Sequence, residues 1–302
     1  MTRLRPVLLT GVALAAAGAA AGCAAALKEA PPLVDLAGGG PPPDATAVAS
    51  LLRQAEDQFA ERTVQSVHRA AALYLRVASA EIASPAGAPS AATPPAGAPS
   101  TATHSAVAPP EGVVGAVQAQ IWLTDHETEP AAREAAATLA VQAAQWCPRI
   151  APGLPDCDFW LGAALGVQAR ERPTTGLSAL PKIEAAFKRA AEAKPEMEDA
   201  GPDRALAYLY LRAPRWPRGP GDPEQGLAHA KKAVALRPDY PPNRLALAEA
   251  LAAAGDAAGS LEAGHEALRL AEARVAQGDP DAGEWVTEAR KSIDGGGRAK
   301  RS

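Results

Sequence analysis

Apolar residues recur at helical spacing along most of this 302-residue chain. Leu51, Ala55 and Phe59 fall on one side of a helix, as do Val67 and Ala71. The same spacing, with Pro or Gly at nearly every junction, predicts helices over residues 45–60, 63–82, 112–125, 131–147, 157–169, 180–194, 203–212, 224–237, 243–254, 259–275 and 281–293. No segment shows sustained alternation with a period of two, so the pattern predicts an all-α protein.

A repeat of small residues followed by proline relates several of these helices. The matching sets are Ile183, Phe187, Ala190, Pro195 and Gly226, Ala230, Ala233, Pro238, with a weaker copy at Ala140, Ala144, Cys147, Pro152. Ser260, Gly264 and Ala267 follow the second set at 34 residues, the period of the tetratricopeptide repeat (TPR). Such pairs bury their apolar faces only by stacking. We therefore expect a TPR-like solenoid of about five helix pairs plus a closing helix, with extra residues in loops at 170–181 and 213–220.

The N-terminus has the features of an export signal. Arg3 and Arg5 precede an uncharged run at 7–21, which as a helix reaches about 22 Å, too short for a ~30 Å hydrocarbon core. The following Ala20–Cys23 resembles a bacterial lipobox, with Ala20 where leucine is usual. Two interpretations follow: removal of 1–22 and lipidation of Cys23, or an ordinary signal peptide that leaves Cys23 free. By resemblance to known lipoproteins, Ala24 favours the inner leaflet of the outer membrane, facing the periplasm.

Low-complexity segments divide the remainder. Residues 23–43 end in Gly-Gly-Gly-Pro-Pro-Pro and are expected to form a flexible tether, and 84–110 carry Pro-Ala-Gly-Ala-Pro-Ser twice and are expected to form a disordered insertion. The helical domain is expected to cover 44–294, and 295–302 to form a disordered tail.

Charge and chemical motifs exclude several functions. The formal net charge of −4 gives no footprint for nucleic acid. The sequence contains no phosphate-binding loop, no His/Cys metal cluster and no nucleophile with an evident base, so we expect no enzyme activity, cofactor or metal. If Cys23 is lipidated, Cys147 and Cys157 remain as an even pair in an oxidising compartment, either as a disulfide or as two buried thiols.

One stretch resembles a known family. Its most specific part is Leu209-Tyr210-Leu211 followed by Pro214, Trp216-Pro217 and Gly221-Asp222, and Phe159-Trp160-Leu161-Gly162 also matches. The resemblance is to the T component of tripartite ATP-independent periplasmic (TRAP) transporters, over roughly 45–293 and strongest from about 156 to 270. Arg215 and the 84–110 insertion depart from the family. The resemblance implies a modified-TPR lipoprotein that associates with a periplasmic solute-binding subunit, with oligomerisation around a pore also implied.

The TPR register places candidate binding residues. With Leu206-Ala207 at repeat positions 7 and 8, the concave face holds Arg204, Tyr208 and Arg212, with Phe159 in the preceding unit and Leu245 and Glu249 in the following one. The arginines can hold a carboxylate or backbone carbonyls. The alternative is an exposed helix face with Tyr208 packed on a neighbour. Trp216 is interpreted either as a wedge over the solenoid or as a docking anchor.

Three functions are compatible with these features of the sequence. The leading hypothesis is a non-catalytic periplasmic lipoprotein that docks a solute-binding subunit and assists solute uptake. The second is a general TPR scaffold lipoprotein for envelope or secretion-complex assembly. The third is a receptor for a small ligand.

Overall fold

The computed structural model describes residues 29–83 and 110–299. The expectations for the signal peptide, for Cys23 and for nearly all of the 84–110 insertion lie outside these residues. The helices are α1 (Leu33–Leu36), α2 (Ala45–Ala60), α3 (Val64–Ala83), α4 (Glu111–His126), α5 (Pro130–Ala144), α6 (Cys147–Ile150), α7 (Pro155–Glu171), α8 (Pro173–Ala193), α9 (Met197–Arg212), α10 (Pro223–Leu236), α11 (Pro241–Ala253), α12 (Ala257–Ala276) and α13 (Ala282–Ala299). In the described ranges the only β-type pairing is an isolated bridge between Arg215 and Gly221.

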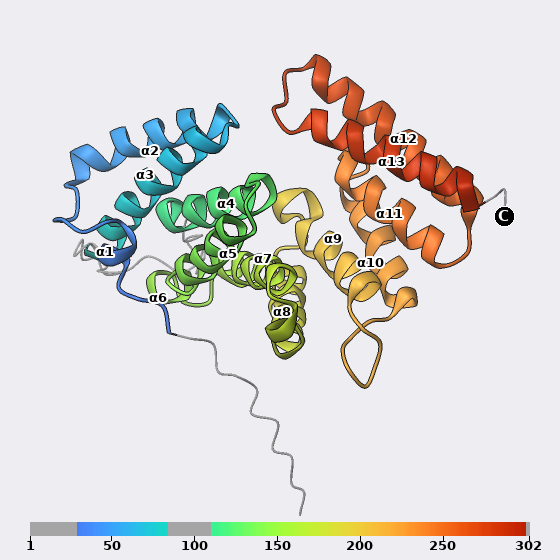
Figure 1. Ribbon diagram of the computed structural model, residues 1–302, viewed down its shortest axis with the longest axis horizontal. Coiled ribbons are helices and arrows are strands. Elements are labelled where there is room, and N and C mark those ends of the chain that lie inside the picture. Colours follow the sequence, from blue (N-terminus) through green and yellow to red (C-terminus); the bar gives the residue numbers. More distant parts are fainter. Residues whose placement is uncertain (1–28, 84–109, 300–302) are drawn as a thin grey trace, which may run out of the picture.

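The helices stack as successive pairs. Helices α2/α3, α4/α5, α7/α8, α9/α10 and α11/α12 pack side by side in chain order, and α13 closes the stack against α12 (Figure 1). The first helix of each pair also contacts the first helix of the next pair, which makes these helices the inner face of the solenoid. The structure is therefore the all-α, TPR-like solenoid that the repeat predicts.

Close helix approach supplies much of the core. A Cβ atom on Gly115 would lie 2.4 Å from the ring of Tyr74, and one on Gly112 would lie 2.4 Å from the backbone nitrogen of Ala78. Glycine at these two positions of α4 thus allows α3 to pack directly against its backbone. The small residues of the repeat act similarly, since Gly226, Ala230 and Ala233 of α10 are all buried. With few aromatic side chains, the fold depends on this small-residue packing.

The segment before α2 is packed, which differs from the flexible tether expected over 23–43. Leu33 of α1 is only 1% exposed. The indole Nε1 of Trp146 donates to the carbonyl of Pro31 at 2.9 Å, and the backbone nitrogen of Ala30 donates to the side chain of Gln145 at 3.2 Å. Residues 29–37 therefore belong to the folded domain, because one buried leucine and two long-range hydrogen bonds fix them.

Two helix boundaries also differ from expectation. The loop expected over 170–181 is helical, because α7 continues to Glu171 and α8 begins at Pro173, a residue suited to the first turn of a helix. Pro181 lies inside α8. The last helix continues to Ala299 instead of ending at 293. The loop expected at 213–220 is present between α9 and α10.

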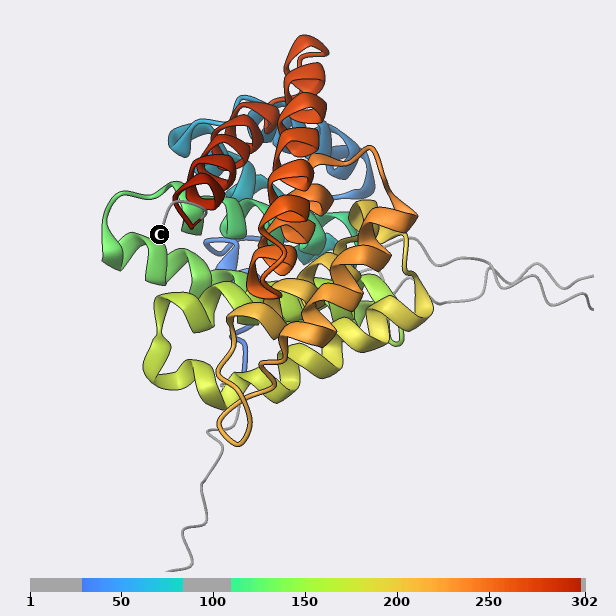
Figure 2. The same cartoon turned by 90° about the vertical axis from the view of Figure 1, so that its right-hand side faces the viewer.

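The two ends of the solenoid meet. Arg62, between α2 and α3, forms an ion pair with Asp281, just before α13, and His126 at the end of α4 contacts Glu284 of α13 at 2.6 Å. Figure 2 shows the first helix pair and α12/α13 on the same upper side of the molecule. Cys147 and Cys157 are joined by a disulfide that ties α6 to the start of α7.

Candidate binding groove

Five of the residues selected from the TPR register line one groove. Arg204, Tyr208 and Arg212 come from α9, and Leu245 and Glu249 come from α11. The opposite wall is α13, which contributes Trp285, Glu288, Lys291 and Ser292. The groove has a volume of about 710 Å³. Three helices separated along the chain therefore converge on one open site.

Arg212 is held at the centre of this groove. Its guanidinium donates to both carboxylate oxygens of Glu249, from Nε at 2.9 Å and from Nη2 at 2.6 Å, and lies 4.1 Å from the ring centre of Tyr208. The hydrogen bond to Glu249 raises the pKa of Arg212. Burial raises the pKa of Tyr208 to about 12. The three side chains form a preorganised cluster in which the arginine charge is already matched.

Arg204 has a different role from the one the sequence suggests. Its Nη1 donates to the carbonyl of Asp199 at 3.0 Å and to the side chain of Asn243 at 2.8 Å, and its Nη2 donates to the carbonyl of Glu198 at 3.1 Å. Glu198, Asp199 and Ala200 all have positive φ, at 48°, 53° and 63°. Because left-handed non-glycine residues are costly, Arg204 serves as the brace of this strained turn, and its guanidinium is occupied by internal acceptors.

Two further charges of the groove, Glu288 and Lys291, come from α13, which sequence reasoning missed; Glu288 interacts electrostatically with Lys291 and Arg212. Neither Glu288 nor Lys291 forms an ion pair within the described ranges. Burial raises the pKa of Glu288, and the nearby Glu284 raises it further. Trp285 packs edge-on against Tyr240 at 5.3 Å between ring centres. Trp285, Glu288 and Ser292 are spaced three or four residues apart and share one face of α13, which was the available signal. The packing of α13 against α12 and α11 directs that face to the groove.

A second, more apolar groove adjoins the first. It has a volume of about 600 Å³ and lies between α7, α8 and α9, where Leu180, Ile183 and Phe187 form its floor. Tyr208 and Arg212 line both grooves. The two sites therefore meet at the Tyr208–Arg212 stack, with a mixed-charge surface on one side and an apolar surface on the other.

Phe159 does not reach the groove, and its assignment to the concave face is wrong. Its side chain is 6% exposed, and its ring lies 5.0 Å from that of Trp160 and 5.9 Å from that of Phe187. A Cβ on Gly201 would come within 2.9 Å of the Phe159 ring. Phe159 is a core residue that packs beneath the start of α9.

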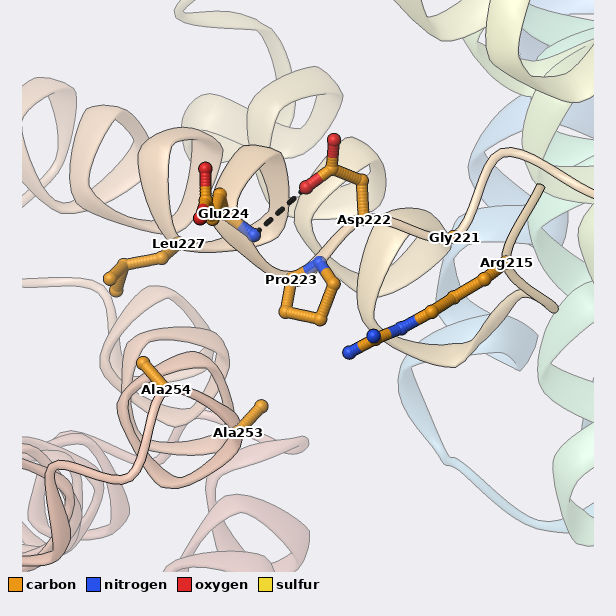
Figure 3. A pocket seen from close by; sticks show the side chains of 8 residues that line it. All are labelled: Arg215, Gly221, Asp222, Pro223, Glu224, Leu227, Ala253 and Ala254. Atoms are coloured by element: carbon orange, nitrogen blue, oxygen red, sulfur yellow. Dashed lines mark hydrogen bonds between the residues drawn. The ribbon is translucent and has the colours of Figure 1, made fainter.

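Trp216 is 86% exposed, so the interpretation as a wedge packed over the solenoid is wrong. Its loop borders a third pocket of about 470 Å³, where the Arg215 side chain extends toward Pro223 and the end of α11 (Figure 3). Asp222 caps α10 by accepting from the backbone nitrogen of Glu224 at 3.0 Å. The docking interpretation of Trp216 stays a prediction.

The described residues show neither a metal-binding cluster nor a membrane-spanning helix. No group of three or more His, Cys, Asp or Glu side chains in them is placed to hold a metal ion. None of the described helices combines the length and apolarity needed to cross a membrane.

Comparison with known proteins gives one type of match. No protein-family model and no curated protein sequence matches the chain. Among solved structures, a thermophilic TPR protein of Thermus thermophilus aligns with a TM-score of 0.55 and 17% sequence identity, covering 82% of this chain and 98% of that one. At this identity the likeness shows the fold: the chain has a TPR-like architecture.

Proposed function

We propose that this chain is a non-catalytic interaction scaffold that holds a segment of a partner protein in the groove between α9, α11 and α13. The observation that carries the proposal is the convergence of α9, α11 and α13 side chains on one open groove of about 710 Å³. Glu288 and Lys291 offer charges for a partner to match, and the adjoining apolar groove offers surface for apolar side chains.

In its finer form, the proposal is that the partner is the solute-binding subunit of a TRAP transporter. The support is the sequence resemblance over about 156–270 and the lipobox-like Ala20–Cys23. Lipidation of Cys23 would hold the scaffold in the periplasm at the inner leaflet of the outer membrane. A component of an envelope or secretion complex is the alternative partner for the same groove.

Crosslinking from two adjacent residues tests the groove. Ala252 lines the groove, whereas Ala253 lines the pocket on the other side of α11. A photo-crosslinking amino acid is placed at each position in turn, and crosslinks formed in the native envelope are identified by mass spectrometry. We expect a partner to be captured from position 252 and not from 253. A Lys291→Glu change should lower that yield several-fold, with Arg290→Glu as its neighbouring control.

The identity of the captured protein separates the alternatives. A solute-binding protein supports the transport form, and an assembly or secretion component supports the general scaffold. Capture of a second copy of this chain would instead assign the groove to self-association. Equal yields from positions 252 and 253 would contradict the groove as the binding site.

A further inference from the structure

The loop between α9 and α10 is closed at its base and has a defined shape. The backbone nitrogen of Gly221 donates to the carbonyl of Pro214 at 2.9 Å, and that of Asp222 donates to the carbonyl of Tyr210 at 2.9 Å. A Cβ on Gly221 would lie 2.1 Å from the carbonyl oxygen of Ala213, so only glycine fits this crossing. The loop therefore presents its tip in a fixed direction.

That tip is apolar and basic. All residues from 214 to 218 are exposed, and Trp216 is 86% exposed. Arg215 and Arg218 flank the tryptophan, and neither forms an ion pair in the part of the chain that the structure describes. The Arg215 side chain extends into the pocket of Figure 3, where the hydrogen bond from Gln225 and, in addition, the charge of Arg215 lower the pKa of the Asp222 carboxyl, so Arg215 is directed away from the tip and partly matched. A largely exposed indole with an arginine on either side in the sequence is the composition of a contact with a membrane interface, where tryptophan is enriched and phosphates are plentiful.

The direction of the loop agrees with such a contact. Figures 1 and 2 share their vertical axis, and in both the loop before α10 protrudes at the lower edge, toward which the first described residues also descend. Glu29 follows Cys23 by six positions along the sequence, and a chain of that length spans at most about 20 Å. A lipid on Cys23 would therefore bring this side to the bilayer. Helices α12 and α13 lie on the opposite, upper side.

We infer that the loop is a second membrane contact, in which Trp216 inserts at the headgroup boundary and Arg218 binds an anionic lipid phosphate. This inference rests on the proposed Cys23 anchor for its orientation. A lipid surface fits better than a protein partner because the tip shares its side of the molecule with the anchored end. The contact fixes the solenoid upright on the membrane, with the α13 wall of the groove directed away from the bilayer.

Quenching by brominated lipids tests the contact. The full-length protein, purified from its own envelope, is mixed with phosphatidylglycerol-containing vesicles whose acyl chains carry bromine, which quenches tryptophans that enter the bilayer. We expect quenching in the wild type, its near-complete loss in Trp216→Phe, and no change in Trp285→Phe, which removes a groove tryptophan. Arg218→Glu should reduce the quenching in anionic vesicles and much less in phosphatidylcholine vesicles, whereas Arg215→Gln, whose side chain lies in the pocket beside Asp222, should change it little.

The outcomes distinguish failure of the loop contact from failure of the proposed lipid anchor on Cys23. The mass of the N-terminal peptide reports lipidation of Cys23 independently of quenching. Quenching that depends on Trp216 without lipid on Cys23 would support the loop contact and contradict the anchor. No quenching in the wild type, or equal quenching in Trp216→Phe, would overturn the loop contact. Protection of Trp216 from acrylamide in the native envelope, without quenching in vesicles, would assign the loop to a protein partner and also overturn the inference.

Discussion

Arg62 and Asp281, which lie 219 residues apart, are joined by two hydrogen bonds, from Nε to Oδ1 at 2.7 Å and from Nη2 to Oδ2 at 3.1 Å. Two contacts with Phe59 orient the guanidinium of Arg62 for this pair. Its Nη1 donates to the carbonyl of Phe59 at 2.7 Å, and the guanidinium lies 4.0 Å from the Phe59 ring centre. With the His126–Glu284 contact, this pair fixes the start of α13. Since α13 forms one wall of the groove, closure of the solenoid sets the groove's width.

Removing both ties should loosen α13 without changing any residue in it. We expect Arg62→Gln combined with His126→Gln to speed hydrogen exchange along α13 by about 5- to 30-fold, because two partly exposed pairs contribute together about 1–2 kcal/mol. Exchange measured by mass spectrometry checks this. Arg290→Gln is the control, since it breaks an exposed pair with Glu272 inside the last two helices. Equal acceleration in the control would show that closure contributes nothing.

Two neighbouring side chains in the N-terminal segment, one buried and one partly exposed, form a matched pair for substitution by alanine. Leu33 is 1% exposed and Val34 is 38% exposed on the same short helix. We expect Leu33→Ala to lower the free energy of unfolding by about 2–4 kcal/mol through lost burial and a residual cavity. Val34→Ala should change it by less than about 0.5 kcal/mol. Urea unfolding measures both, and similar small effects would mean that the segment is a flexible tether after all.

Two glycines of the inner helices should respond in opposite directions to alanine. Gly115→Ala places a methyl group against the Tyr74 ring and should cost about 1–3 kcal/mol of stability by overpacking. Nothing lies within 4 Å of the corresponding position on Gly166 of α7. Gly166→Ala should therefore stabilise the protein by about 0.5–1 kcal/mol, because alanine is the better helix former. Thermal unfolding of the two variants checks the signs, and destabilisation by both would contradict this packing of α7.

Much of the fold could be predicted because it is locally encoded. The segment predicted at 45–60 coincides with α2, where Asp44 caps the helix and Leu51 and Ala55 are buried. Features that depend on distant contacts could not be predicted. Helix α1, which carries the buried Leu33, packs against α3 and α5, and nothing in a run rich in Gly and Pro reveals those neighbours.

The candidate site also contains residues that the local repeat predicts and residues whose position depends on other helices. The repeat register predicts a shared face for Tyr208, Arg212 and Glu249, and these residues line one groove, because first-helix positions recur in each pair; their role in binding stays a prediction. It fails for Phe159, because Gly201 of α9 and Phe187 of α8 pack against that ring and bury it. The α13 wall was missed because the register was applied only to the first helices of the preceding pairs and was not extended to α13, which packs against α12 and α11.

Tyr208 gives a direct optical test of the groove's centre. Burial raises its pKa to about 12, from about 10 in an unfolded chain. The folded state therefore holds the phenolic proton more tightly, so this contribution to stability is complete below about pH 10 and is lost as the pH rises toward 12.

We expect Tyr208→Phe to remove about a quarter of the phenolate absorbance change, since the chain has four tyrosines. The loss should fall in the part of the titration above pH 11, and the variant should lose less stability between pH 10 and 12. Phe retains the ring beneath Arg212, so the stack and the groove stay intact. A loss of absorbance centred near pH 10 instead would mean that Tyr208 is open to water, and that the Tyr208–Arg212–Glu249 cluster does not form as described.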